Sequence, residues 1–275
     1  AQYPILTLGA TTTGLLDFAR VAVGTTTSSN GAGLRDQFFV SGRINSSWGM
    51  YSNDFVSVGS TIGSAIANTD ATGILGGLNF DEDTDCQLTA HVDNNVHSGS
   101  GSVIFRPGAS AGPLAAGHGC VLNGGSPYLI SATSSPVFET RIALENITGS
   151  AVGFGFEDRN SANSDAGATT TKQLAMFKMN LGGNWHAVVK NGGPADSNET
   201  FVNTGISSSA DTNYHTFRIE LEQFGRAIFL IDGKVVANIT TNVPTTLMNF
   251  VILHEAVTTT ASLRTNIDYL KIWAD

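Results

Sequence analysis

The spacing of acidic residues is the first feature that could carry chemistry in this sequence. Hydrolysis of a glycosidic bond uses two carboxyl groups, about 5–5.5 Å apart where configuration is retained. Glu220 and Glu222 would share one strand face about 7 Å apart, without a third acid in the pattern. Glu139 and Glu145 would share a face about 20 Å apart, with Arg141 between them. We interpret both pairs as solvated outer faces of strands and predict that the chain is not an enzyme.

A short acidic run has the spacing of a calcium loop in its first half. Asp81, Asp83 and Asp85 stand at the first, third and fifth positions of such a loop. An EF-hand needs Gly at the sixth position and Glu at the twelfth, where this chain has Cys86 and Val92. The sequence therefore excludes an EF-hand. A plain acidic turn is the first interpretation, and a looser calcium site at the three aspartates is the alternative.

The remaining histidines and cysteines predict neither a metal site nor a cofactor. Of the 6 His, His91 and His97 are closely spaced, but no further ligands follow at the spacing of a zinc site. Cys86 and Cys120 are the 2 Cys, and neither has the flanking residues of a nucleophile. They are either free thiols or one disulfide, so they do not fix the compartment. We expect no cofactor.

Charge and composition exclude two classes of partner. The formal net charge is -9 and the 14 Lys and Arg are scattered, whereas nucleic-acid binding needs clustered cations that neutralise phosphates. No apolar run approaches the ~20 residues that cross a bilayer, so we expect no membrane contact. Charged residues make up only 13% of the chain, so much of the surface must be neutral and polar. Such a surface suits packing against a neighbouring protein or a sugar.

From about residue 35 onward the hydrophobic pattern predicts strands. Apolar and polar residues alternate with the period of a strand that buries one face. Asp232-Gly233 lies between two apolar runs and predicts a tight hairpin. No segment has the pattern of a long amphipathic helix, and many short strands joined by turns are typical of an all-β sandwich. The clearest alternations are in segments 138–145, 152–156, 177–181 and 217–222.

Residues 1–34 differ from the rest and are predicted to form an arm. Polar low-complexity stretches flank one apolar segment, which fits a short helix as well as a strand. We expect the arm to dock on the domain formed by residues 35–275 or to reach a neighbouring subunit. A loosely ordered tail is the alternative. The residues expected to make the assembly contact are Leu15, Leu16, Phe18, Val21 and Val23.

A succession of short motifs runs along the chain. In order, they are DQFF (36–39), SWG (47–49), VFETRI (137–142), GFGFED (153–158), NW (184–185), NYHTFRI (213–219), FLIDGKVV (229–236) and NIDYLKIW (266–273). This order resembles the concanavalin A-like lectin and glucanase superfamily, and above all its divergent members among tailed-bacteriophage structural proteins. The resemblance covers about residues 35–275. It implies a jelly-roll sandwich of two curved antiparallel sheets.

The resemblance also bears on function. Catalytic members of the superfamily carry carboxylates on one strand in a Glu-x-Asp-x-x-Glu pattern, which this sequence lacks. Together with the low charge, the polar arm and an expected absence of a signal peptide, this favours a non-catalytic virion structural protein. We predict a capsid decoration or cement protein at the particle surface, assembled in the host cytoplasm. Its expected partners are the major capsid protein or another virion protein, and further copies of itself.

A carbohydrate-binding adhesin on a tail or fibre is the second interpretation. Aromatic stacking and a few carboxylate hydrogen bonds suffice to hold a sugar, although a tryptophan in a strand is also typical of core packing. A β-glucanase that depends on Glu220 or Glu222 is the third interpretation. The residues expected to contact a sugar are Trp185, His186, Glu157, Asp158 and Arg159.

Overall fold

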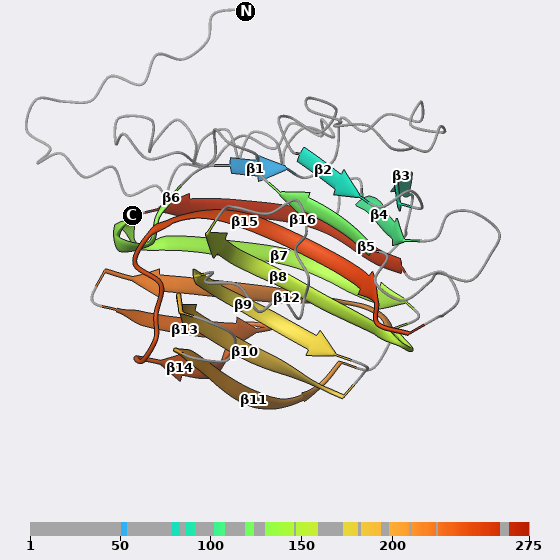
Figure 1. Ribbon diagram of the computed structural model, residues 1–275. Coiled ribbons are helices and arrows are strands. Elements are labelled where there is room, and N and C mark those ends of the chain that lie inside the picture. Colours follow the sequence, from blue (N-terminus) through green and yellow to red (C-terminus); the bar gives the residue numbers. More distant parts are fainter. Residues whose placement is uncertain are drawn as a thin grey trace, which may run out of the picture.

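The protein is built from strands, as its computed structural model shows. The structure describes residues 51–53, 79–82, 86–91, 102–107, 119–123, 130–145, 147–158, 173–180, 183–193, 198–208, 211–223, 225–258 and 264–274. Within these ranges the chain forms strands and one short 3-10 helix, Ala132–Ser134. Two antiparallel sheets, A and B, pack face to face (Figure 1). The predicted all-β sandwich is therefore confirmed.

Sheet A contains the first and the last of the described strands. Its members are β1 (Tyr51–Asn53), β3 (Cys86–His91), β4 (Ser102–Pro107), β7 (Pro136–Glu145), β12 (Asp211–Glu222), β13 (Arg226–Ile231), β14 (Lys234–Ile239) and β16 (Arg264–Ala274). The order across the sheet is β14-β13-β12-β7-β16-β4-β3, and β1 pairs with β16. Strands far apart in sequence are thus neighbours, which is typical of a jelly roll.

Sheet B has the same number of strands and a similar interleaved order. Its members are β2 (Asn79–Glu82), β5 (Gly119–Asn123), β6 (Ile130–Ser131), β8 (Ser150–Asp158), β9 (Gln173–Asn180), β10 (Asn184–Asn191), β11 (Glu199–Ser207) and β15 (Leu247–Ala256). The order is β11-β10-β9-β8-β15-β5-β2, and β6 pairs with β15. The end strands β11 and β14 of the two sheets contact each other, at the bottom of Figure 1.

Aromatic rings fill the space between the two sheets. Phe154 of β8 meets Phe217 of β12 edge to face, with ring centroids 4.8 Å apart. Phe177 of β9 meets Phe229 of β13 in the same way at 5.2 Å. All four side chains are buried, and each such pair adds about 0.5–1.5 kcal/mol to the gain from burial. The alternating apolar positions of the sequence therefore form one core, as predicted.

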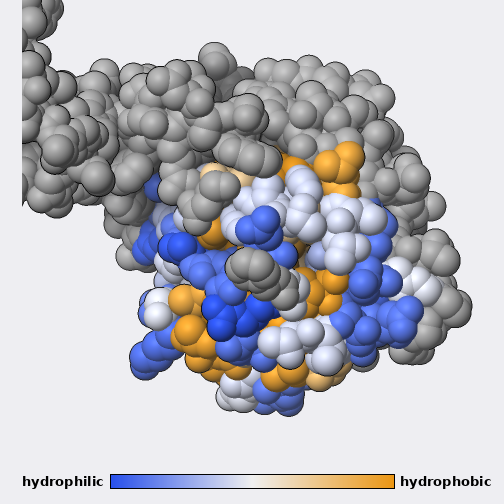
Figure 2. All heavy atoms as spheres, turned by 90° about the vertical axis from the view of Figure 1, so that its left-hand side faces the viewer, coloured by the Kyte–Doolittle hydropathy of each residue, from blue (hydrophilic) through white to orange (hydrophobic). Residues whose placement is uncertain are grey.

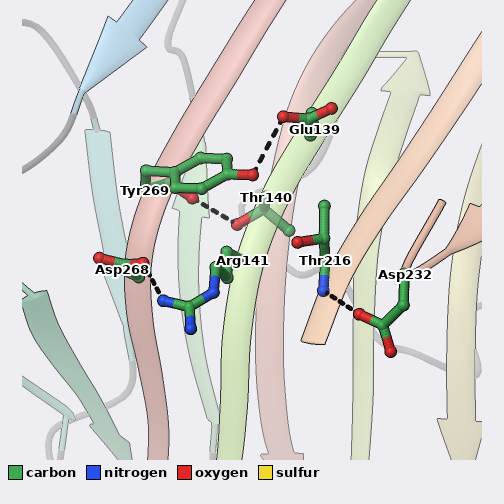
Figure 3. Close-up of polar contacts among 7 residues, drawn as sticks. All are labelled: Glu139, Thr140, Arg141, Thr216, Asp232, Asp268 and Tyr269. Atoms are coloured by element: carbon green, nitrogen blue, oxygen red, sulfur yellow. Dashed lines mark hydrogen bonds and ion pairs between the residues drawn. The ribbon is translucent and has the colours of Figure 1, made fainter. Parts of the chain in front are cut away.

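The predicted hairpin at Asp232-Gly233 joins β13 to β14. Both residues have positive φ, 50° and 76°, as a tight turn matched to the twist of the strands requires. The Asp232 carboxylate also accepts a hydrogen bond from the Thr216 backbone N–H at 2.9 Å (Figure 3). It lies 2.7 Å from His215 Nδ1 as well. The turn carboxylate thus connects the hairpin to the neighbouring strand β12.

The predicted arm cannot be compared with the structure. Residues 1–50 lie outside the described part of the chain, together with Leu15, Leu16, Phe18, Val21 and Val23. The arm, its boundary near residue 35 and the assembly contact stay predictions. Within the described ranges, no helix has the length and apolar character needed to cross a membrane.

Candidate functional site

Trp185 lies inside the sandwich, which corrects the prediction that it contacts a sugar. Its side chain is only 4% exposed. The ring packs edge-on against Phe154 and Phe217, with centroids 5.2 and 5.0 Å away. A sugar stacks on an open ring face, and a tryptophan enclosed by two other rings offers none. Core packing accounts for this residue.

The other residues expected to contact a sugar do not come together. Glu157 is buried on the outer face of sheet B, near the end of β8. His186 shares that face but lies on β10, two strands away, where it is paired with Lys178 of β9. Asp158 follows Glu157 and points to the opposite side, because side chains alternate along a strand. Arg159 lies outside the described residues.

The centre of the outer face of sheet B is apolar and buried. Gly153 of β8 contributes no side chain there, and a Cβ at that position would touch Met176 and Leu253. Lys190 of β10, on the same face, is 2% exposed. Toward the end strand β11, the described residues of this face include solvent-exposed side chains. The buried apolar residues of the centre are Leu174, Met176, Val188, Val251 and Leu253.

Phe201 and His186 form a stacked pair of rings on the accessible part of this face. Their centroids are 4.2 Å apart and the ring planes differ by 24°. Phe201, on the end strand β11, is 57% exposed. Asn203 of β11 lies directly opposite His186, and Asn184 precedes it by two residues on β10. We call His186, Phe201, Asn184 and Asn203 the β10–β11 platform.

Large exposed side chains are rare enough to single out this platform. Among the described residues, the large exposed hydrophobic side chains are Phe201, Val235 and Leu247. In the described part of the face in Figure 2, small apolar areas alternate with polar ones. Sequence reasoning missed Phe201. In this strand Val202, Thr204 and Ile206 point to one side, and Phe201 points to the other side together with polar residues. An aromatic ring on the polar side of a strand was the signal available in the sequence.

The platform combines ring faces with amide groups. The Asn184 Nδ2 group donates a hydrogen bond to Asn203 Oδ1 at 3.0 Å. The Gly205 backbone N–H donates to the same oxygen at 2.8 Å. Burial lowers the pKa of His186, so its imidazole is neutral at pH 7 and offers one donor and one acceptor nitrogen. No hydrogen bond from a described residue occupies those nitrogens.

The outer face of sheet A carries a different cluster, in which the acids are already paired. Arg218 Nε lies 2.7 Å from Glu220 Oε1, and its Nη1 lies 3.6 Å from Glu139 Oε2. The same guanidinium lies over the ring of Trp273, 5.1 Å from its centroid. A cation therefore stands between the two carboxylates, where a sugar would have to bind. Glu222 is paired as well, and its hydrogen bond from Arg226 lowers the pKa of the carboxyl group.

Tyr269 extends this cluster toward the middle of sheet A. Its hydroxyl group donates to Glu139 Oε1 at 3.0 Å (Figure 3). Burial, and then the charge of Glu139, raise the pKa of Tyr269, so the hydroxyl keeps its proton. Beside it, the register of β16 shifts between Ile267 and Tyr269, and the fully buried carboxylate of Asp268 pairs with Arg141 (Figure 3). These contacts join strands, and each of the acids named in this cluster is paired with a neighbouring side chain.

The predicted calcium site falls mostly outside the described residues. Asp81 lies in β2, whereas Asp83 and Asp85 are not described. Among the residues that are, no group of three or more His, Cys, Asp and Glu is placed to hold a metal ion. The calcium site therefore stays an untested prediction.

Comparison with known proteins identifies the fold. No protein-family model matches the chain, and no curated protein does. Among solved structures, the β-glucanase of Bacillus licheniformis is 14% identical, with a TM-score of 0.51 over 82% of this chain and 98% of that one. A glycoside hydrolase family 16 protein of Bacteroides ovatus, in complex with a mixed-linkage glucan product, is 10% identical, with a TM-score of 0.51 over 81% and 99%. A Shewanella oneidensis protein of unknown function is 10% identical, with a TM-score of 0.53 over 82% and 85%.

The fold is the concanavalin A-like jelly roll. The predicted jelly-roll architecture is thus confirmed, whereas nothing in the comparisons links the chain to phage structural proteins. The prediction that the chain is not an enzyme is overturned, because the proteins that share its fold include a β-glucanase and a glycoside hydrolase family 16 protein. The absence of the Glu-x-Asp-x-x-Glu pattern was too narrow a basis for predicting that the chain is not an enzyme. At these identities the likeness shows the fold alone, so function has to be argued from the chain's own residues.

Proposed function

We propose that this protein binds a neutral glycan through the β10–β11 platform. The observation that carries the proposal is Phe201, a ring that is 57% exposed and stacked on His186. A pyranose has a flat face of C–H groups that packs on an aromatic ring, while its hydroxyl groups need hydrogen-bonding partners. The platform supplies both kinds of group. The proteins that share the fold include glucanases, so β-glucans are the first ligands to test.

Calorimetric titration with mixed-linkage β-glucan oligosaccharides tests this proposal. Phe201→Ala removes the exposed ring and should weaken binding about tenfold, the equivalent of about 1.4 kcal/mol. Val235→Ala is the matched control, because Val235 is 60% exposed but belongs to β14 of sheet A. The glycan affinity of Val235→Ala should equal that of the unchanged protein. The proposal fails if no glycan binds, or if Phe201→Ala binds as tightly as the control.

Glucan hydrolysis is a second candidate function, and the position of Glu157 favours it. Its carboxyl group is buried on the same sheet face as the platform, and β9 places apolar Leu174 opposite it. A glycosidase needs an acid that protonates the leaving-group oxygen and a second carboxylate as nucleophile or base. Glu157 is the candidate for the first role. Glu139 and Glu220 are on the other sheet and are both in contact with Arg218.

Reducing ends released from mixed-linkage β-glucan measure this activity directly. Glu157→Gln removes the acid while keeping its shape, and it should abolish release. Glu220→Gln removes an acid of the sheet A cluster and should leave the rate unchanged. Hydrolysis is ruled out as the function if the unchanged protein releases no reducing ends. The role of Glu157 is ruled out if Glu157→Gln keeps the full rate.

The virion location remains a separate proposal from the sequence. It rests on the arm at residues 1–34, as do its expected partners, a capsid protein and further copies of this chain. Deleting residues 1–34 should abolish attachment to particles while leaving the β signal of the circular dichroism spectrum intact. Unchanged attachment would refute this use of the arm.

A further inference from the structure

We infer that Asn184 and Asn203 together recognise two adjacent hydroxyl groups of one neutral sugar ring on the platform. This inference deepens the proposed glycan-binding function and rests on it. It concerns which chemical groups of the ligand are recognised, whereas the stacking on Phe201 concerns only the ring face. Both amides flank the exposed ring pair on the outer face of sheet B.

The Gly205 backbone fixes the orientation of the Asn203 amide. A backbone N–H can only donate, so the Asn203 atom 2.8 Å from it must be the carbonyl oxygen. The Nδ2 group of Asn203 therefore points the other way, with two N–H donors. Gly205 has a φ of +73°, which a glycine adopts without strain. The register of β10 and β11 shifts at this point, between Asn184 and His186.

The orientation of Asn203 in turn fixes that of Asn184. The Asn203 oxygen accepts, so the Asn184 atom 3.0 Å from it must be the Nδ2 group. The carbonyl oxygen of Asn184 is then left on the other side of its amide. Among the described residues, nothing bonds to this oxygen or to the Asn203 Nδ2 group. The pair thus presents one acceptor and one set of donors next to each other.

This arrangement matches the chemistry of a vicinal diol. One hydroxyl oxygen can accept from Asn203 Nδ2, while the next hydroxyl donates to the Asn184 carbonyl. A carboxylate or sulfate has no proton to donate, so it would leave the Asn184 oxygen facing another acceptor. The burial that lowers the pKa of His186 keeps the ring uncharged, which also suits a neutral ligand. The ligand class is therefore a neutral pyranose with two adjacent free hydroxyl groups.

Asn203→Asp is the sharpest variant for testing this. The carboxylate still accepts from Gly205 N–H and from Asn184 Nδ2, so the internal contacts are retained, but its outward group changes from a donor to an acceptor. Binding of a β-glucan tetrasaccharide should weaken about tenfold or more, because a hydroxyl oxygen then faces an acceptor. Asn238→Asp is the matched control, since Asn238 is an exposed asparagine of β14 in sheet A and changes the net charge equally.

Tetrasaccharides that lack one hydroxyl at a time provide a measurement that needs no variant. Loss of either of two adjacent hydroxyl groups should weaken binding to the unchanged protein, and loss of the others should not. The inference is overturned if the glycan binds and depends on Phe201, yet Asn203→Asp binds like the Asn238→Asp control. It is also overturned if no adjacent pair of hydroxyl groups matters. Absence of any glycan binding would refute the proposed function and this inference together.

Discussion

His254 of β15 and Ser150 of β8 are hydrogen-bonded to each other inside the protein, with Nε2 3.1 Å from Oγ. The other ring nitrogen, Nδ1, lies 2.8 Å from Thr265 Oγ1 of β16, so this imidazole connects sheet B to sheet A. Ser150 Oγ donates its proton to the Ile147 carbonyl oxygen at 2.9 Å. His254 therefore donates from Nε2, and because complete burial keeps the ring neutral, Nδ1 carries no proton and accepts from Thr265. It cannot serve as a base toward Ser150.

Stability should fall in acid because His254 is held neutral. Complete burial lowers its pKa from 6.5 to about 3. Above pH 6.5 the ring is neutral in both the folded and the unfolded chain and contributes no pH dependence. As the pH falls from 6.5 toward 3, only the unfolded chain takes up the proton, so this group lowers the free energy of unfolding by about 1.4 kcal/mol per pH unit.

Denaturant unfolding at pH 7, 6, 5 and 4 checks this expectation. Paired carboxylates also lose stability in acid, so the informative quantity is the difference in slope between the unchanged protein and His254→Asn. The variant should be less stable at pH 7 but lose less stability per pH unit below 6.5. Equal slopes for the two proteins would contradict the assignment of a neutral, buried His254.

Gly155→Ala should destabilise the fold far more than Gly153→Ala. A Cβ at position 155 would collide with the Ala175 carbonyl oxygen, which is backbone and cannot move aside, and φ is +145° there. At position 153 the nearest atoms, at 3.2 and 3.3 Å, belong to the flexible side chains of Met176 and Leu253. We expect a loss of about 3 kcal/mol or more at 155 and about 1 kcal/mol at 153. Melting temperatures of the two variants measure this, and similar values would count against the strained backbone at 155.

The two-sheet architecture was predictable because it depends on local alternation. Phe217, Ile219 and Leu221 alternate with charged residues, and the structure buries all three. The side of each strand that faces the core follows from such a pattern without knowledge of its partners. The hairpin at Asp232-Gly233 is local for the same reason, since two consecutive residues with positive φ determine it.

The candidate site was not predictable, because it depends on pairing between strands. The stacking of Phe201 on His186 requires the register of β10 against β11, including its shift between Asn184 and His186. No residue type in either strand reveals that shift. Trp185 was placed on the wrong side because an aromatic residue in a strand suits both a core and a sugar. The alternation of its own strand is too weak to decide, since Val188, which faces outward, is as buried as Val189.

The ion pair between Arg141 and Asp268 should matter more for stability than the exposed pairs of sheet A. The Asp268 side chain is 0% exposed, and Arg141 also lies over the Tyr214 ring, 4.7 Å from its centroid. Arg141→Met keeps much of that packing but removes the cation from a buried carboxylate, so we expect a loss of about 3 kcal/mol. The double variant Arg141→Met with Asp268→Asn should lose less than the sum of the single variants. Strict additivity in denaturant unfolding would show that the two groups do not depend on each other.

Variants of Trp185 and His186, which are neighbours in sequence, should affect stability and glycan binding separately. Trp185→Ala removes a ring enclosed by Phe154 and Phe217 and should cost about 3–5 kcal/mol of stability. Glycan affinity, measured below the melting temperature of the variant, should stay unchanged because the ring does not reach the platform. His186→Ala removes the ring under Phe201 and should weaken glycan binding severalfold, with a loss of stability below about 1 kcal/mol. The opposite pattern, in which Trp185→Ala abolishes binding in a protein that is still folded, would restore Trp185 as a sugar contact and move the site away from the platform.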